Sequence, residues 1–113
     1  MMFSETEVVT VIETITVHEL RGWVRAGWVA PAESEAGPLY DELDVARIRL
    51  VLQLRQDLAV PDDALPLVLS LLDQVHGLRR ELRTLTQAVE AQPGPVRSDV
   101  RAAYRALIQS RNG

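Results

Sequence analysis

Residues 14–31 read TITVHELRGWVRAGWVAP, a stretch with the form of the turn, second helix and exit of a helix-turn-helix unit. Thr16 stands in an N-cap position, and Glu19 three residues later completes a capping-box pattern. Apolar residues then recur at helical spacing until Gly27, which can take a positive φ where the helix ends. The stretch therefore predicts a helix from Thr16 that stops at Gly27 and continues as a short extended arm to Pro31.

The segment before this stretch repeats the same pattern. Ser4 and Glu7 form a second capping-box pair and predict a short first helix from about Ser4 to Ile12. The valines and the isoleucine of this segment would also suit a strand. A helix here, followed by the tight link 13–15, gives a helix-turn-helix.

The segment after the arm predicts a wing and a third helix. Residues 32–37, AESEAG, are polar and small, so we expect Trp28–Ala30 and Leu39–Tyr40 to pair as two short antiparallel strands around this loop. Asp41, with an acid three residues later, predicts the N-cap of a helix from Glu42 to about Ala59.

A long helix is expected next, capped by Asp62 and Asp63 and running to about Ala91, with Pro66 tolerated in its first turn. One face has apolar residues spaced alternately by four and three, which is typical of a coiled coil. This face, termed the seam, continues from Ala64 through Val68, Leu71, Val75, Leu78, Leu82, Leu85 and Val89. A helix of roughly 40 Å is too long for so small a domain to bury. We therefore predict a homodimer through the seam, with parallel and antiparallel pairing both open.

The end of the chain predicts a linker and one more helix. The run from Gln92 to Pro95 breaks the long helix, and Ser98 is a suitable N-cap for an amphipathic tail helix. That tail either folds back on the dimer helix or stays mobile. The expected organisation is mainly α: a winged helix-turn-helix domain at 1–61, a dimerisation helix at 62–91, and a linker with tail helix at 92–113.

Composition narrows the classes of function. The chain of 113 residues has no cysteine, which excludes disulfides and thiolate chemistry, and its formal net charge of −4 argues against a nonspecific polyanion binder. No apolar run approaches a membrane span and no basic leader is present, so we expect a cytoplasmic protein without membrane association. His18 and His76 lack partners at metal-ligand spacing, and no phosphate loop or nucleophile motif occurs. We expect no catalytic residue, metal or cofactor, and hence no enzyme.

The succession of elements resembles the MerR-like winged-helix regulators. Residues that match their usual pattern in type and spacing are Ile15, Thr16, Leu20, Arg21, Gly27, Trp28, Val29, Pro31 and Tyr40. Departures fall where those regulators touch DNA: Gly22 and Trp23 replace two tyrosines, Val24 replaces a glutamate, and Glu33 and Pro38 replace wing arginines. Between Ala26 and Ala46 stand five acids and no base. Such a wing would repel a phosphate backbone.

Within that group the chain resembles the chaperone modulatory CbpM proteins over roughly Phe3 to Ala88. The resemblance rests on the acidic wing, ITVHELRGWVRAGWVAP, LRQDLAV and SLLDQVHGLRREL. It implies a non-enzymatic homodimer that binds the J-domain of a DnaJ-like co-chaperone, CbpA, and inhibits its work with Hsp70. J-domains present a basic helix, which an acidic surface can mask.

The candidate partner-binding residues follow from that implied role, and each acid could equally be a solvated surface residue. They are Glu5, Glu7, Glu19, Trp23, Glu33, Glu35, Asp41 and Glu42. For Trp23, a position in the core is the favoured interpretation, since large apolar side chains in a small domain usually pack there. The alternative function is a MerR-type transcriptional regulator that binds DNA through Arg21 and Arg25.

Overall fold

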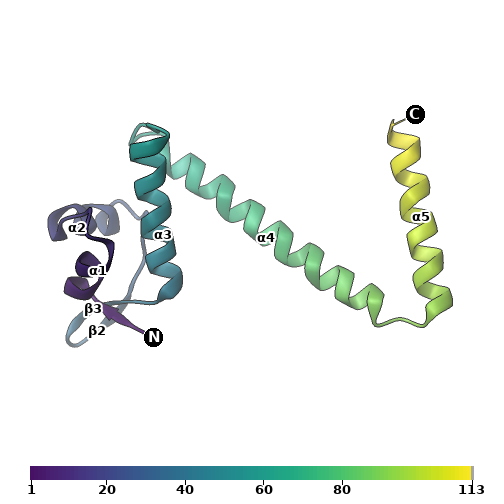
Figure 1. The fold of residues 1–113 in the computed structure, drawn as a ribbon, viewed down its shortest axis with the longest axis horizontal. Coiled ribbons are helices and arrows are strands. Elements are labelled where there is room, and N and C mark those ends of the chain that lie inside the picture. Colours follow the sequence, from purple (N-terminus) through teal and green to yellow (C-terminus); the bar gives the residue numbers. More distant parts are fainter. Residues whose placement is uncertain (113) are drawn as a thin grey trace. The chain divides into compact units, whose positions relative to one another are not determined.

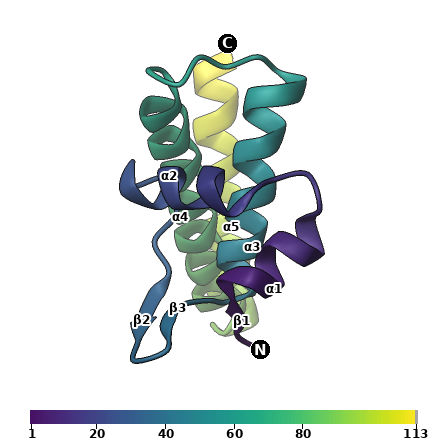
Figure 2. The ribbon, with the colours of Figure 1, turned by 90° about the vertical axis from the view of Figure 1, so that its left-hand side faces the viewer.

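A computed structural model describes residues 1–112 as two compact units, the first of residues 1–70 and the second beginning at Leu71. The first unit contains three helices, a short π-helix and a small sheet, and α4 begins within it (Figures 1 and 2). In order these are β1 (Phe3–Ser4), α1 (Glu5–Ile12), α2 (Val17–Arg25), β2 (Ala32–Ser34), β3 (Gly37–Tyr40), α3 (Glu42–Leu52), η1 (Gln53–Asp57) and α4 (Leu65–Glu90). The mainly α winged helix-turn-helix class is confirmed.

Reciprocal capping boxes begin each of the first three helices. Ser4, Thr16 and Asp41 each accept a hydrogen bond from the backbone N–H three residues on, and the acid at that position accepts one in return. The first segment is therefore helical rather than extended, since its cap satisfies donors that a short helix otherwise leaves unpaired. Gly27 adopts φ 81° beyond α2, as its position at the helix end predicts.

The wing differs from the expected pair of strands. Trp28 and Val29 are buried and form no strand, because the arm turns its large side chains into the core. The strand that pairs is the exposed Ala32–Ser34, which joins Gly37–Tyr40 across a two-residue turn. A third strand, β1, pairs antiparallel with β3 on its other side and gives the order β1-β3-β2.

The core of the first unit lies between α1, α2, α3 and the start of α4. Its fully buried large side chains are Val8, Leu20, Val29, Tyr40, Ile48, Val51 and Leu65. Burying a side chain of this size stabilises the fold by roughly 1.5–3 kcal/mol. Leu69 is buried as well, with 2% of its surface exposed, so α4 contributes its first turn and a half to this core.

The third helix ends earlier than expected. It passes into η1 and stops at Asp57 instead of Ala59, where the backbone turns with a φ of 52°. Asp62 and Asp63 then lie in a turn before α4, and Asp62 binds Arg55 instead of acting as an N-cap side chain. Pro66 occupies the first turn of α4, where its missing N–H leaves no donor unpaired.

The second unit holds the rest of α4 and α5 (Gly94–Asn112). A break separates the two helices as expected, but it is shorter than predicted: only residues 91–93 lie between them, and Ser98 lies inside α5 instead of capping it. Pro95 again falls in a first helical turn, where it costs no hydrogen bond. No helix among the described residues is long and apolar enough to cross a membrane.

Candidate partner-binding surface

Three of the candidate acids hold helix starts. The Glu7 carboxylate accepts from the Ser4 N–H at 3.2 Å, and that of Glu19 accepts from the Thr16 N–H at 3.3 Å. Asp41 accepts from the Asp44 N–H at 2.7 Å. These carboxylates stabilise the positively polarised helix starts and are already engaged with backbone donors.

The half-buried Asp44 and the buried Tyr40 are titratable groups beside the wing whose pKa values are shifted. Burial raises the pKa of the Asp44 carboxyl, against the hydrogen bond with the Asp41 backbone, which lowers it. Burial also raises the pKa of the Tyr40 hydroxyl, and the nearby carboxylate of Glu5 adds to the shift. Neither shift comes with a cavity or a nucleophile, so both are accounted for by helix capping and core packing.

Glu5 and Arg21 form a bidentate ion pair between α1 and α2. The Arg21 Nε and Nη2 atoms donate to the two Glu5 carboxylate oxygens at 3.0 and 2.8 Å. Hydrogen bonding to Arg21 holds the pKa of Glu5 below its ordinary value. The recognition-helix arginine that would contact DNA in the alternative function is therefore neutralised by an acid of its own chain, while Arg25 is exposed.

Glu33, Glu35 and Glu42 are the exposed candidates without such a role. Among the described residues these three side chains, termed the unpaired acids, make no hydrogen bond or ion pair. Glu33 and Glu35 lie on the β2–β3 hairpin, which Ser34 braces by donating to the Gly37 carbonyl at 2.6 Å. Glu42 follows β3 in the first turn of α3. The structure thus presents Glu33 and Glu35 on a short, braced wing and Glu42 on the helix that follows it.

Trp23 is in the core. Its side chain is 4% exposed and its ring centre lies 6.5 Å from that of Trp28 in a tilted arrangement. Edge-tilted aromatic pairs at this separation stabilise packing. Trp23 is therefore part of the core and is not an exposed anchor for a partner.

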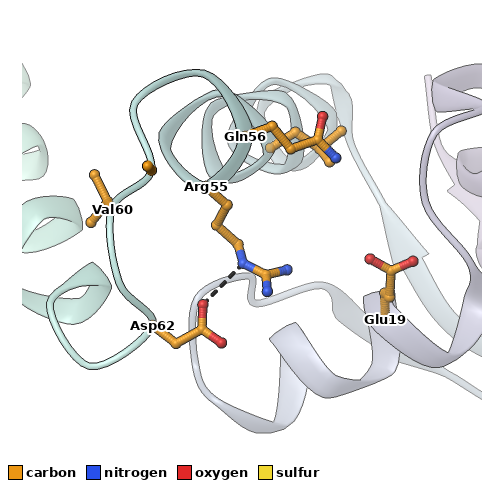
Figure 3. Close-up of a pocket in the computed structure, with 7 residues that line it drawn as sticks. Glu19, Arg55, Gln56, Val60 and Asp62 are labelled. Atoms are coloured by element: carbon orange, nitrogen blue, oxygen red, sulfur yellow. Dashed lines mark hydrogen bonds and ion pairs between the residues drawn. The ribbon is translucent and has the colours of Figure 1, made fainter.

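Arg55 links the recognition helix to the turn before α4. Its guanidinium carbon lies 5.7 Å from the Trp23 ring centre, and its Nε donates to Asp62 at 3.0 Å (Figure 3). The two residues line an open groove of about 410 Å³ together with Glu19 and Gln56. The sequence predicts Asp62 as a helix cap, and no local signal predicts its pairing with Arg55, because Arg55 lies in η1 and Asp62 in the turn before α4.

Metal chemistry has no donor cluster in residues 1–112. No group of three or more His, Asp or Glu side chains converges there. His18 stands at the rim of a second groove beside Arg25 and Trp28. Neither groove combines a metal-ligand set with a nucleophile and a base.

The seam of α4 is exposed beyond the first unit. Leu71, Val75, Leu78, Leu82 and Leu85 are between 42% and 65% exposed, whereas Val68 and Val89 are half-buried. The structure brings the seam residues onto one helix face, as their spacing predicts. An uncovered row of this kind is typical of a helix that has a partner.

Most of the chain matches a known protein family. A family model described as MerR HTH family regulatory protein matches residues 3–87. No curated protein matches the chain. The matched segment includes the winged domain and α4 nearly to its end, but not α5.

Proposed function

Because the chain belongs to the family of MerR HTH regulatory proteins, we propose that it acts as a homodimeric, non-enzymatic modulator of chaperones. In this proposal it binds the J-domain of a DnaJ-like co-chaperone of the CbpA type and inhibits its work with Hsp70. The resemblance of residues 15–31 and of the acidic wing to the CbpM proteins supports this choice within the family.

The observation that carries the proposal is the charge on the DNA-reading face of a winged helix. Arg21 on the recognition helix is held by Glu5, and the hairpin carries Glu33 and Glu35 without a base. The first unit as a whole has twelve carboxylates against five arginines. A phosphate backbone would release few counterions on this surface and would be repelled by the wing.

The same charges suit a basic protein partner. Complementary charge accelerates encounter and suppresses wrong partners, and exposed acids can supply it without desolvating a core. We therefore assign the J-domain contact to the unpaired acids Glu33, Glu35 and Glu42. Glu7, Glu19 and Asp41 contribute negative potential but keep their capping bonds.

The proposal is tested by titrating an isolated J-domain with the wild type and with Glu33→Arg/Glu35→Arg. We expect the reversal to weaken binding by about 10- to 100-fold, because two attractive charges become repulsive. The matched control is Asp57→Arg/Asp63→Arg, which makes the same change in net charge at the end of η1 and in the turn before α4, outside the wing. The affinity of this control variant for the J-domain should stay within about threefold of that of the wild type.

Two outcomes would contradict the proposal. An affinity that is unchanged by the wing reversal would remove the wing from the contact, and absence of any J-domain binding would reject the partner. A salt-dependent, sequence-selective shift of a DNA duplex, lost in Arg25→Ala, would instead favour the transcriptional regulator.

A further inference from the structure

The tail helix α5 is the least accounted-for part of the chain. It spans Gly94–Asn112, lies wholly outside the family match, and has no buried residue. A helix of nineteen residues that buries nothing is marginal by itself in water, because helices of this length gain most of their stability from packing. Its apolar face therefore requires a cover.

That face is a continuous row. Five apolar side chains, termed the α5 stripe, are 36% to 66% exposed; four of them recur every three or four residues, namely Val96, Val100, Tyr104 and Leu107, and Ile108 stands beside the last. Spacing of this kind places them along one side of a helix. The stripe is thus equivalent in form to the α4 seam.

Ion pairs at the junction orient α5 without covering the stripe. Glu90, at the end of α4, accepts from Arg101 at 2.6 Å and lies 3.8 Å from Arg97. At about 100° per residue, Arg97 and Arg101 lie on the side of α5 that Tyr104 and Ile108 also share. These ion pairs leave the five stripe side chains 36% to 66% exposed.

The apolar area indicates that the seam alone makes too small an interface. Burying a fully exposed side chain of this kind removes roughly 90 Å² from water. The five seam residues are 42% to 65% exposed, so each has only about half of that area left to bury, and those of two copies together supply about 500 Å². At an apolar share of about 65%, this corresponds to an interface of about 800 Å². Stable interfaces bury about 1,200–2,000 Å².

Adding the α5 stripe brings the area into that range. Its five side chains are about as exposed as those of the seam, so they nearly double the apolar surface, and the interface reaches about 1,500 Å². The lengths also agree, because α4 from Leu71 onward and α5 are about 30 and 28 Å long. Two helices of equal length joined by three residues are a common half of a four-helix bundle.

We propose that the α5 stripe of each protomer packs against the α4 seam of a second copy, so that the dimer interface is a four-helix bundle built from α4 and α5. This inference rests on the homodimer of the proposed function and not on its J-domain partner. The stripe and the seam are then each other's cover.

The test is sedimentation equilibrium of the full chain with two matched double variants. Val100→Asp/Leu107→Asp places charges on the stripe, and Ala102→Asp/Gln109→Asp adds the same charges seven residues apart on the opposite side of the same helix. We expect the stripe variant to raise the dimer dissociation constant at least about 100-fold and the control less than about threefold.

The outcomes separate this inference from the proposed function. A wild type that is monomeric throughout rejects the homodimer itself. A wild-type dimer that tolerates the stripe variant, or that the control weakens equally, overturns the role of α5. A stripe variant that dimerises normally but loses J-domain binding overturns it too, because the stripe would then belong to the partner site.

Disulfide trapping decides whether the contact lies between copies. The chain has no cysteine, so introduced pairs are unambiguous. Tyr104→Cys protein is mixed with copies that carry one cysteine at Leu71, Val75, Leu78, Leu82 or Leu85, and we expect a mixed covalent dimer at one or more positions. If no mixture cross-links, while chains carrying both cysteines oxidise internally, α5 folds back on its own α4 and the inference is wrong.

Discussion

The turn of the helix-turn-helix depends on two residues, Glu13 at the end of α1 and Thr16 at the start of α2. Glu13 closes α1 with φ 64° and ψ −32°, a left-handed conformation that costs a residue with a side chain roughly 1–2 kcal/mol. Its N–H still donates to the Val9 carbonyl at 3.0 Å. This last hydrogen bond of α1 helps to hold Glu13 in the strained conformation that turns the chain toward α2. Three residues after Glu13, Thr16 already caps α2, so the link between the two helices is too short for the backbone to relax.

Glu13→Gly should therefore stabilise the protein. Relief of the strain exceeds the extra chain entropy of glycine, which is roughly 0.5–1 kcal/mol, so we expect the free energy of unfolding to rise by about 0.5–1 kcal/mol. Urea unfolding at fixed protein concentration measures it. Glu13→Ala, which removes the charge but keeps the Cβ, should show no such gain; an equal gain would assign the effect to charge.

The Glu5–Arg21 pair gives the winged domain a dependence on pH. Arg21 lowers the pKa of Glu5 from its ordinary value of 4.5, so the folded state binds that proton less tightly than the unfolded state. The pair's contribution is therefore complete above the unfolded pKa and is lost as pH falls through the lower, folded pKa.

Unfolding of the wild type and Glu5→Gln should accordingly differ at pH 7, and the difference should shrink as the pH falls below the ordinary pKa of 4.5. Glu35→Gln is the control, because that exposed carboxylate has no hydrogen bond or ion pair among the described residues. A difference between wild type and Glu5→Gln that persists unchanged at pH 3 would refute the ion pair as its source.

Among the helices and strands, the sequence predicts a boundary correctly where a single capping residue or a regular spacing of apolar residues determines it. Each of the three capping boxes joins residues only three apart, and the positive φ of Gly27 is a property of that residue alone. The sequence therefore predicts the starts of α1, α2 and α3 and the end of α2. The wing strand was misplaced because burial of Trp28 and Val29, a tertiary effect, outweighed their strand propensity. β1 has only two residues, too short for any periodicity.

The seam of α4 carries the prediction of this scale. Leu78→Asp or Leu82→Asp should convert the proposed dimer into a monomer, because each copy would bury a charge without a partner. Thr84→Asp, exposed and on the opposite side of α4, should leave the dimer mass unchanged. Sedimentation velocity distinguishes the two, and an unchanged mass for both seam variants would place the dimer contact elsewhere.

For the molecule as a whole, the sequence predicted the fold more fully than the candidate surface. The acids were recognisable as a group, but which of them are occupied depends on contacts between elements. The partner of Glu5 lies sixteen residues away, and that of Arg55 lies seven residues away, beyond the end of η1. Such pairings have no local signature, so the restriction to Glu33, Glu35 and Glu42 needed the structure.

The division of the chain can be tested by truncation. Leu65 and Leu69 are buried in the first unit, so that unit requires the start of α4. A fragment of residues 1–76 should fold as a monomer, whereas residues 1–61 should not, since losing each leucine costs about 2–5 kcal/mol of a total near 5–15 kcal/mol. Within the longer fragment, Leu65→Ala should destabilise by that amount and the 64% exposed Leu67 should tolerate the same change, as measured by thermal unfolding. Equal folding of both fragments would mean that the core closes without α4, and the long helix would then serve association alone.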